Sequence, residues 1–215
     1  AYHLGGTIGY IRLNRFTSKT LGEVQPALKE LKAQGVQNLI IDLRDNRGGV
    51  VTAATELADE FLPKGKLIMS SDGHKMPKSE IFATEGGLFE TGKIAILTNS
   101  VTASASEIFT GAMQEWDRAL VLGEMTYGKG LIQQSYLLGD SSAVRLTIGR
   151  YYTPTDRTLQ RPYRFDTSKD WIFQNIANSI TTKNGFTAAL EVPDSVAWKT
   201  KSGRKILKGQ GSIIP

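Results

Sequence analysis

Apolar and polar residues alternate along the chain in patterns that predict short strands separated by amphipathic helices. Nearly continuous apolar runs predict strands buried on both faces of a sheet, at 38–43 and 93–98. Apolar residues spaced three and four apart predict helices at 17–34, 51–61 and 104–116. Other short apolar or alternating stretches predict strands at 7–14, 66–70 and 119–123, and a hairpin formed by 131–138 and 143–152.

The order of these elements predicts an α/β layered domain, because strands and helices alternate three times before the hairpin. Pro26 lies inside the first helical pattern, so we expect the regular helix to start near Pro26 or to bend there. Residues 72–92 combine polar residues with glycine and proline, which predicts a long surface excursion. The pattern weakens after Thr153, where we expect a helix at 171–180 and a loop or late strand at 199–215.

The composition narrows the chemistry that the chain can perform. The chain contains no cysteine, which excludes thiol nucleophiles, disulfides and cysteine-ligated zinc. Its two histidines, His3 and His74, lack partners at metal-ligand spacing, and we expect exposed side chains rather than members of a Ser-His-Asp triad. The net charge of +5 is not gathered in a basic stripe beside aromatic residues, which favours a solvated surface over nucleic-acid binding. No apolar run approaches the ~20 residues that span a bilayer.

Small residues follow the buried strand at 93–98 and open the helix after it, in the segment Thr102 to Glu107. A hydroxyl on Ser104 would lie at the positive end of that helix, beside free backbone amides. This position suits a nucleophile whose intermediate carries an oxyanion. The alternative is a capping box formed by Ser104 and Glu107. A capping box does not explain why every residue from Thr102 to Ser106 is small.

Lys129 lies between two glycines, which is typical of an exposed turn. A phosphate-binding loop is a second interpretation, but the P-loop spacing is absent and no hydroxyl residue follows the lysine. In the third interpretation Lys129 is a general base, which requires burial, because lysine titrates near ~10.4 in water. Gln133 could then orient the amine by accepting a hydrogen bond. Strand alternation places Gln134 on the opposite face, so only one of the two can serve.

A third segment, residues 42–49, reads Asp-Leu-Arg-Asp-Asn-Arg-Gly-Gly and follows a buried strand. Gly48 and Gly49 allow the backbone to approach a ligand and to present N–H groups as an oxyanion hole. The alternative is a tight strand-to-helix turn, which needs the same glycines. Arg44 and Asn46 are candidates to hold this loop by hydrogen bonds.

Four segments together resemble the carboxyl-terminal processing peptidases, also called tail-specific proteases: IIDLRDNRGG, TASASEIFTGAMQEWDRALVLGE, TYGKGLIQQ and AVRLTIGRYYTPTDRTLQRPY. The resemblance covers residues 7–163 in the family's order and spacing. It implies that Ser104 is the nucleophile, that Lys129 is the base, and that Gln133 orients Lys129. It also implies an oxyanion hole made by the backbone amide of Ala105 and by that of Gly48 or Gly49, with the choice between the glycines open.

The resemblance further implies an α/β protease core related to the crotonase-like spiral of strands and helices. The core is expected at 1–163, with 164–215 as an extension packed on it. No cofactor is implied. The implied partners are protein or peptide substrates cleaved near their C termini, and the implied location is exported, in the periplasm, the cell envelope or the thylakoid lumen.

Two departures from the family pattern stand out. The family usually carries a PDZ domain, for which we expect no room in this chain, and Arg47 occupies a loop position that is often glycine. Two other functions therefore stay open: a non-catalytic ligand-binding module of the same fold, as in retinoid-carrier repeats, and a core that is inactive without its PDZ domain. The natural substrate and the formation of a homo-oligomer are also left open.

Overall fold

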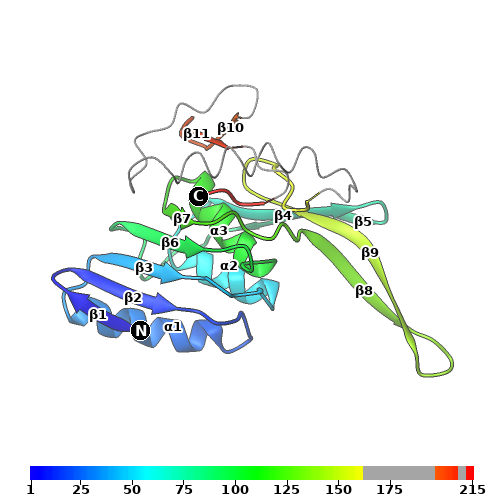
Figure 1. Cartoon of the computed structure of the whole chain (residues 1–215), viewed down its shortest axis with the longest axis horizontal. Coiled ribbons are helices and arrows are strands. Elements are labelled where there is room, and N and C mark those ends of the chain that lie inside the picture. The colour runs from blue at the N-terminus through cyan, green and yellow to red at the C-terminus, as the bar shows by residue number, and fades with distance from the viewer. Residues whose placement is uncertain (162–196, 208–211) are drawn as a thin grey trace.

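The computed structural model describes residues 1–161, 197–207 and 212–215. Its first sheet has five strands in the order β1-β2-β3-β6-β7 (Figure 1). The strands are β1 (Tyr2–Gly5), β2 (Ile8–Arg12), β3 (Asn38–Asp42), β6 (Ile94–Thr98) and β7 (Leu120–Gly123). All neighbours are parallel except β1, which pairs antiparallel with β2.

This parallel arrangement positions three loops at one edge of the sheet, because parallel strands end on the same side. The carboxyl end of β3 leads into the Gly48–Gly49 loop, that of β6 into the Ser104 segment, and that of β7 toward Lys129. The three segments selected from the sequence therefore share one edge.

Three helices pack on this framework: α1 (Thr20–Ala33), α2 (Val51–Asp59) and α3 (Ala105–Glu115). Every residue of α3 is buried, and α3 contacts both α2 and β4 of the second sheet. The Phe109 ring of α3 lies 5.8 Å from that of Phe61 and 6.3 Å from that of Phe16, centroid to centroid. The helix that begins at the candidate nucleophile is thus held on all sides by the core. In the described part of the chain, no helix combines the length and apolar character needed to cross a membrane.

The second sheet is antiparallel, with the order β5-β4-β9-β8. Its strands are β4 (Leu67–Gly73), β5 (Met76–Phe82), β8 (Leu131–Leu137) and β9 (Ala143–Tyr152). The hairpin of β8 and β9 projects away from the rest of the molecule as a two-stranded arm (Figure 1). Lys129 lies just before the base of this arm.

Two short strands near the end of the chain, β10 (Ala197–Lys199) and β11 (Lys205–Leu207), pair with each other. Residues 212–214 are buried, and Ile213 belongs to the main hydrophobic core. Distant parts of the sequence therefore complete the core around α3.

The sequence predicted most of these elements to within a few residues, and His3 and His74 are exposed as expected. Three expectations were wrong or incomplete. The antiparallel strand β1 was missed. Helix α1 begins at Thr20, well before Pro26, which sits inside it on an exposed face where water can replace the lost hydrogen bond.

The third correction concerns residues 72–92, which were expected to form a surface excursion. Most of their first half belongs to β5, which pairs with β4 across a tight turn. Turn residues at both ends concealed a strand with few buried side chains. The helix predicted at 171–180 lies outside the described residues.

Candidate active site

Ser104 adopts a backbone conformation that a simple helix cap does not need. It occupies the sharp turn between β6 and α3 with φ 60° and ψ −119°. An N-cap residue normally has an extended conformation, and a positive φ costs a non-glycine residue about 1–3 kcal/mol. Strain of this kind, on a serine at a strand-turn-helix junction, is typical of an exposed nucleophile. The geometry therefore favours the nucleophile interpretation over the capping box alone.

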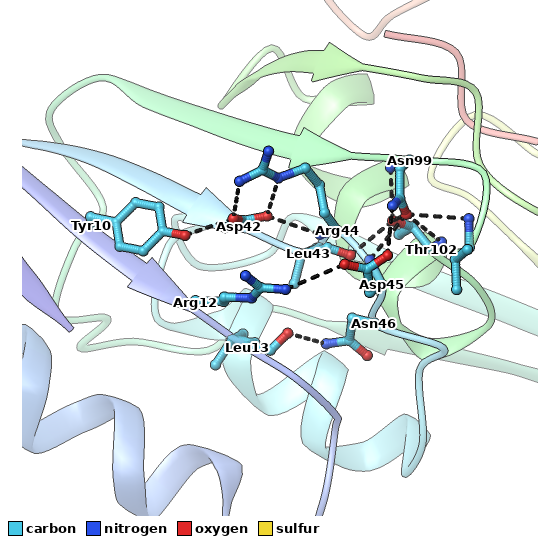
Figure 2. A network of polar contacts seen from close by, with 11 residues as sticks. Tyr10, Arg12, Leu13, Asp42, Leu43, Arg44, Asp45, Asn46, Asn99 and Thr102 are labelled. Carbon is cyan, nitrogen blue, oxygen red and sulfur yellow. Dashed lines mark hydrogen bonds and ion pairs between the residues drawn. The ribbon is translucent and has the colours of Figure 1, made fainter.

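The small residues around Ser104 pack closely against the loop that follows β3. Thr102 donates its hydroxyl to the carbonyl oxygen of Leu43 at 2.8 Å (Figure 2). The amide of Ala103 and the hydroxyl of Ser106 both donate to the carbonyl oxygen of Asn46, at 3.0 and 3.1 Å. Loop packing thus accounts for part of the small-residue stretch that the sequence left unexplained.

Asn46 holds the glycine loop from inside, as expected. Its buried side chain donates to the carbonyl oxygen of Leu13 at 2.8 Å (Figure 2). Its side-chain oxygen accepts the amide of Gly48 at 2.9 Å. Removing this amide group would leave buried backbone groups on two segments without partners. Asn46 is therefore the side chain that fixes the shape of the loop.

Arg44 acts through Asp42 at the end of β3. The guanidinium donates to both carboxylate oxygens, at 2.9 and 2.7 Å, and the hydroxyl of Tyr10 donates at 2.6 Å (Figure 2). Burial alone raises the pKa of Asp42, but the hydrogen bonds from Arg44 and Tyr10 prevail and lower it to about 2. The ionised carboxylate joins β2 and β3 beside the loop.

The two loop glycines face different neighbours. A Cβ atom on Gly48 would lie 2.5 Å from the carbonyl oxygen of Ala103 and 2.7 Å from the amide nitrogen of Ala105. A Cβ atom on Gly49 would lie 1.9 Å from the carbonyl oxygen of Phe16. Positive φ values of 86° and 147° add to the requirement for glycine at both positions. Gly48 thus provides the close contact with the turn that carries the candidate nucleophile.

The backbone amides near Ser104 differ in their availability. The amide of Gly48 already donates to Asn46. The amide of Val50 points toward Phe16 and donates to its carbonyl oxygen, so alternation turns the preceding amide, that of Gly49, to the other side. Within the described residues neither Gly49 nor Ala105 donates its amide to any acceptor. These two amides are free to bind a negatively charged oxygen.

Glu107 connects the candidate nucleophile to the lysine loop, a role that the sequence analysis missed. One carboxylate oxygen accepts the amides of Ser104 at 2.7 Å and Lys129 at 2.8 Å. The other accepts the hydroxyl of Thr126 and the amide of Gly128, both at 2.6 Å. Burial raises the pKa of Glu107, and the four hydrogen bonds oppose that rise. The capping bond to Ser104 was expected, but nothing in the local spacing reveals the bonds to the loop.

The side chains of Lys129 and Gln133 are exposed, although the lysine backbone is firmly held. Among the described residues, the Nζ atom of Lys129 takes part in no hydrogen bond or ion pair. Gln133 lines the same pocket as Lys129, whereas the side-chain oxygen of Gln134 accepts the hydroxyl of Tyr136. The structure thus brings both candidates to one pocket but does not bury the amine, as a base would require.

This pocket has a volume of about 730 Å³ and lies at the edge of the sheet where the three loops meet. Ala103 and Lys129 line it, together with Gln133 from the hairpin arm and two arginines, Arg47 and Arg161. Its lining contains cationic, amide and apolar groups and no acidic side chain. Its size and mixed polarity suit a segment of peptide.

Comparison with known proteins gives these features a context. The model of peptidase family S41 matches residues 7–166. A carboxyl-terminal-processing protease of Synechocystis is 36% identical over 157 residues, which are 73% of this chain and 36% of that protein. A chloroplastic C-terminal processing peptidase of Tetradesmus obliquus is 38% identical over 68% of this chain and 32% of its own length. The solved structure of a photosystem II D1 C-terminal processing protease aligns with this chain at a TM-score of 0.67 and 35% identity. The alignment covers 71% of this chain and 39% of that protein.

These matches define the class as serine-type peptidases. The chain belongs to peptidase family S41. It spans between 32% and 39% of the length of the three relatives described above.

Proposed function

We propose that this chain is the catalytic core of a serine endopeptidase that cleaves proteins near their C termini. Ser104 is the nucleophile, Lys129 the general base and Gln133 the residue that orients the amine. The observation that carries this proposal is the strained turn at Ser104. It lies beside the amide of Ala105, which donates no hydrogen bond within the described residues. The names of the relatives supply the class of substrate.

The proposed reaction uses these groups in two steps, acylation and deacylation. The Ser104 hydroxyl attacks the scissile carbonyl carbon while its proton passes to the uncharged amine of Lys129. The tetrahedral intermediate collapses to an acyl-enzyme, and the Lys129 ammonium returns the proton to the leaving amine. Water then attacks the ester and gives a proton to Lys129, which passes it to the Ser104 oxygen as the ester bond breaks and the new carboxyl terminus leaves. No cofactor takes part in these steps.

The amides of Ala105 and Gly49 are the proposed donors to the oxyanion. Among the described residues neither amide donates a hydrogen bond, whereas the amide of Gly48 donates to the side chain of Asn46. Gly48 serves instead by leaving room against Ala105, where any side chain would collide. Donors of this kind are worth roughly 10²–10³ in kcat in other hydrolases.

Substrate binding is the proposed cause of Lys129 activation. A lysine can act as a base only when it loses its charge, which exclusion of water favours. A peptide that fills the pocket would cover the exposed amine and direct its flexible stem toward Ser104. Gln133 would then accept one hydrogen bond from the amine and keep it aimed.

The wider context is also proposed by resemblance. The two sheets around α3 support a crotonase-like spiral for the core, with a boundary near residue 163 and a packed extension after it. Bacterial and chloroplastic relatives support an exported location.

Cleavage of casein by purified protein tests the proposal. Ser104→Ala should abolish cleavage while the thermal unfolding temperature stays close to that of the unchanged protein. Ser18→Ala is the matched control, because Ser18 is exposed and its side chain forms no hydrogen bond within the described residues. Undiminished cleavage by the Ser104→Ala protein would exclude the proposed mechanism.

A core that is inactive alone is a second candidate, favoured by the exposure of the Lys129 amine. It predicts that the chain cleaves casein only when joined to the PDZ domain expected from the family. Equal cleavage with and without that domain would exclude this second candidate. Binding of an apolar ligand without any cleavage would instead favour the ligand-binding module.

A further inference from the structure

We infer that Thr126 and the distant segment 212–214 are positioning elements of the active site, which hold Glu107 so that it can anchor both the Ser104 turn and the Lys129 loop. This inference rests on the proposed function for its effect on catalysis. The buried hydrogen bonds that link Ile213 to Thr126 and Thr126 to Glu107 do not depend on that function. Thr126 contacts none of the reacting atoms and acts through Glu107.

The hydroxyl of Thr126 stands between Glu107 and Ile213. It donates to the carboxylate of Glu107 at 2.6 Å and accepts the amide of Ile213 at 2.8 Å. The backbone amide of Thr126 in turn donates to the carbonyl oxygen of Ile213 at 3.0 Å. Because the Ile213 amide occupies the acceptor side of the hydroxyl, the proton of that hydroxyl is directed at Glu107. All three residues are buried to the same degree, with relative exposures of 0%.

Segment 212–214 is itself held by side chains from two other parts of the fold. Gln114, near the end of α3, donates to the carbonyl oxygen of Ile214 at 2.6 Å. Arg157 donates to the carbonyl oxygen of Ser212 at 3.1 Å, and it is fixed by a buried ion pair with Glu115 at 2.8 Å. The segment therefore presents the Ile213 amide to Thr126 from a rigid position.

The carboxylate of Glu107 needs this support because its two oxygens have different tasks. One oxygen binds Thr126 and Gly128, and the other binds the amides of Ser104 and Lys129. Loss of the Thr126 bond would remove one of the four donors to a carboxylate that is closed to bulk solvent, and would leave it held only by backbone amides of the two segments that it must position. The anchor that the two halves of the active site share would then be weakened.

Replacing Thr126 by valine and by serine separates this role from simple packing. Thr126→Val keeps the volume but removes the hydroxyl, and we expect kcat to fall roughly tenfold to hundredfold with little change in KM. Thr126→Ser restores the hydroxyl and should recover most of the kcat. Thr55→Val is the matched control, since it removes the hydroxyl of another buried threonine. Among the residues that the structure describes, that hydroxyl bonds only to the carbonyl oxygen of Thr52 inside α2. That control should lose some stability and keep its kcat.

Hydrogen exchange gives a readout that does not depend on peptidase activity. In Thr126→Val the amides of Gly128 and Lys129 should exchange faster than in the unchanged protein, and in Thr126→Ser they should stay protected. Wild-type kcat and protection in Thr126→Val would overturn the inference, as would a Thr126→Ser protein as impaired as the valine variant. If the unchanged protein cleaves nothing, the proposed function fails. Hydrogen exchange at Gly128 and Lys129 then still supports or refutes the link from Ile213 through Thr126 to Glu107.

Discussion

The two halves of the candidate site are built in different ways. The Ser104 half is rigid, because a strained turn, a buried helix and a glycine loop hold one another through buried hydrogen bonds. The Lys129 half has a fixed backbone, but the side chains of Lys129 and Gln133 are exposed at the base of the hairpin arm. In the proposed mechanism, the fold therefore supplies the geometry of the Ser104 nucleophile in advance and leaves the burial of the Lys129 amine to substrate binding.

The physical reason for this difference is the cost of burying charge. A strained backbone costs a few kcal/mol, which a packed core can offset. A buried lysine without a partner must either lose its proton or pay a much larger desolvation penalty. Under the proposed mechanism, the exposed lysine avoids that penalty until substrate excludes water from the pocket.

The largest expected effect concerns the exposed half. Lys129→Ala should lower kcat/KM for a peptide substrate roughly 10²–10⁴-fold, the usual contribution of a general base. Because the side chain is exposed, the free energy of unfolding should change by no more than about 0.5 kcal/mol. Lys129→Arg should be as inactive, since arginine keeps its proton.

Lys75→Ala is the matched control for this prediction, because Lys75 is an exposed lysine in the turn between β4 and β5. It should leave both kinetics and stability unchanged. Activity that survives in Lys129→Ala would show that the two halves do not work as one site.

The next effect concerns the rigid half. Gly48→Ala should lower the free energy of unfolding by roughly 2–4 kcal/mol, because the new methyl group would collide with Ala103 and Ala105 at a φ of 86°. Gly139→Ala, on the hairpin turn, meets nothing within 4 Å and should change it by less than about 0.5 kcal/mol. Urea unfolding measures both, and equal losses would contradict the contrast between rigid core and open arm.

A smaller effect should appear in the pH dependence of stability. The pKa of Asp42 falls from 3.8 to about 2 on folding, so its ionised form stabilises the native state above pH 4 by about 2 kcal/mol. Because the folded pKa is the lower one, that contribution is lost as the pH falls from about 4 to about 2. The stability difference between the unchanged protein and Asp42→Asn should therefore shrink across that interval, as measured by urea unfolding.

Asp140 provides the control, because its carboxylate is exposed on the hairpin turn and solvent screens its hydrogen bonds to Ser142. The stability difference between the unchanged protein and Asp140→Asn should vary much less with pH. A constant difference for Asp42→Asn would show that its carboxylate is not held by Arg44 and Tyr10 as the structure indicates.

The smallest effect is expected on the hairpin arm. Leu137 is 84% exposed, so Leu137→Gln should change the free energy of unfolding by less than about 0.5 kcal/mol. A loss well above 1 kcal/mol would mean that the arm buries this side chain in solution. Urea unfolding at two protein concentrations would then reveal whether self-association is the cause.

The sequence by itself determined the peptidase class and most of the elements. The apolar runs marked β3 and β6, and the small residues after β6 marked the turn of Ser104, because burial and local geometry leave periodic signals. It failed where the signal is not local: β1 pairs through its backbone although all four of its residues are exposed, and Pro26 is tolerated because its lost bond faces water. The segments that resemble a peptidase family supplied the remaining site residues.

Only the tertiary structure decided how these residues are connected. Glu107 looks like a capping residue in the sequence, yet in the fold it binds the lysine loop and, through Thr126, a segment nearly at the end of the chain. The availability of the Gly49 amide and the exposure of Lys129 were likewise beyond sequence reasoning. Hydrogen bonds between residues far apart in the chain depend on how whole elements pack, and no local pattern encodes that packing.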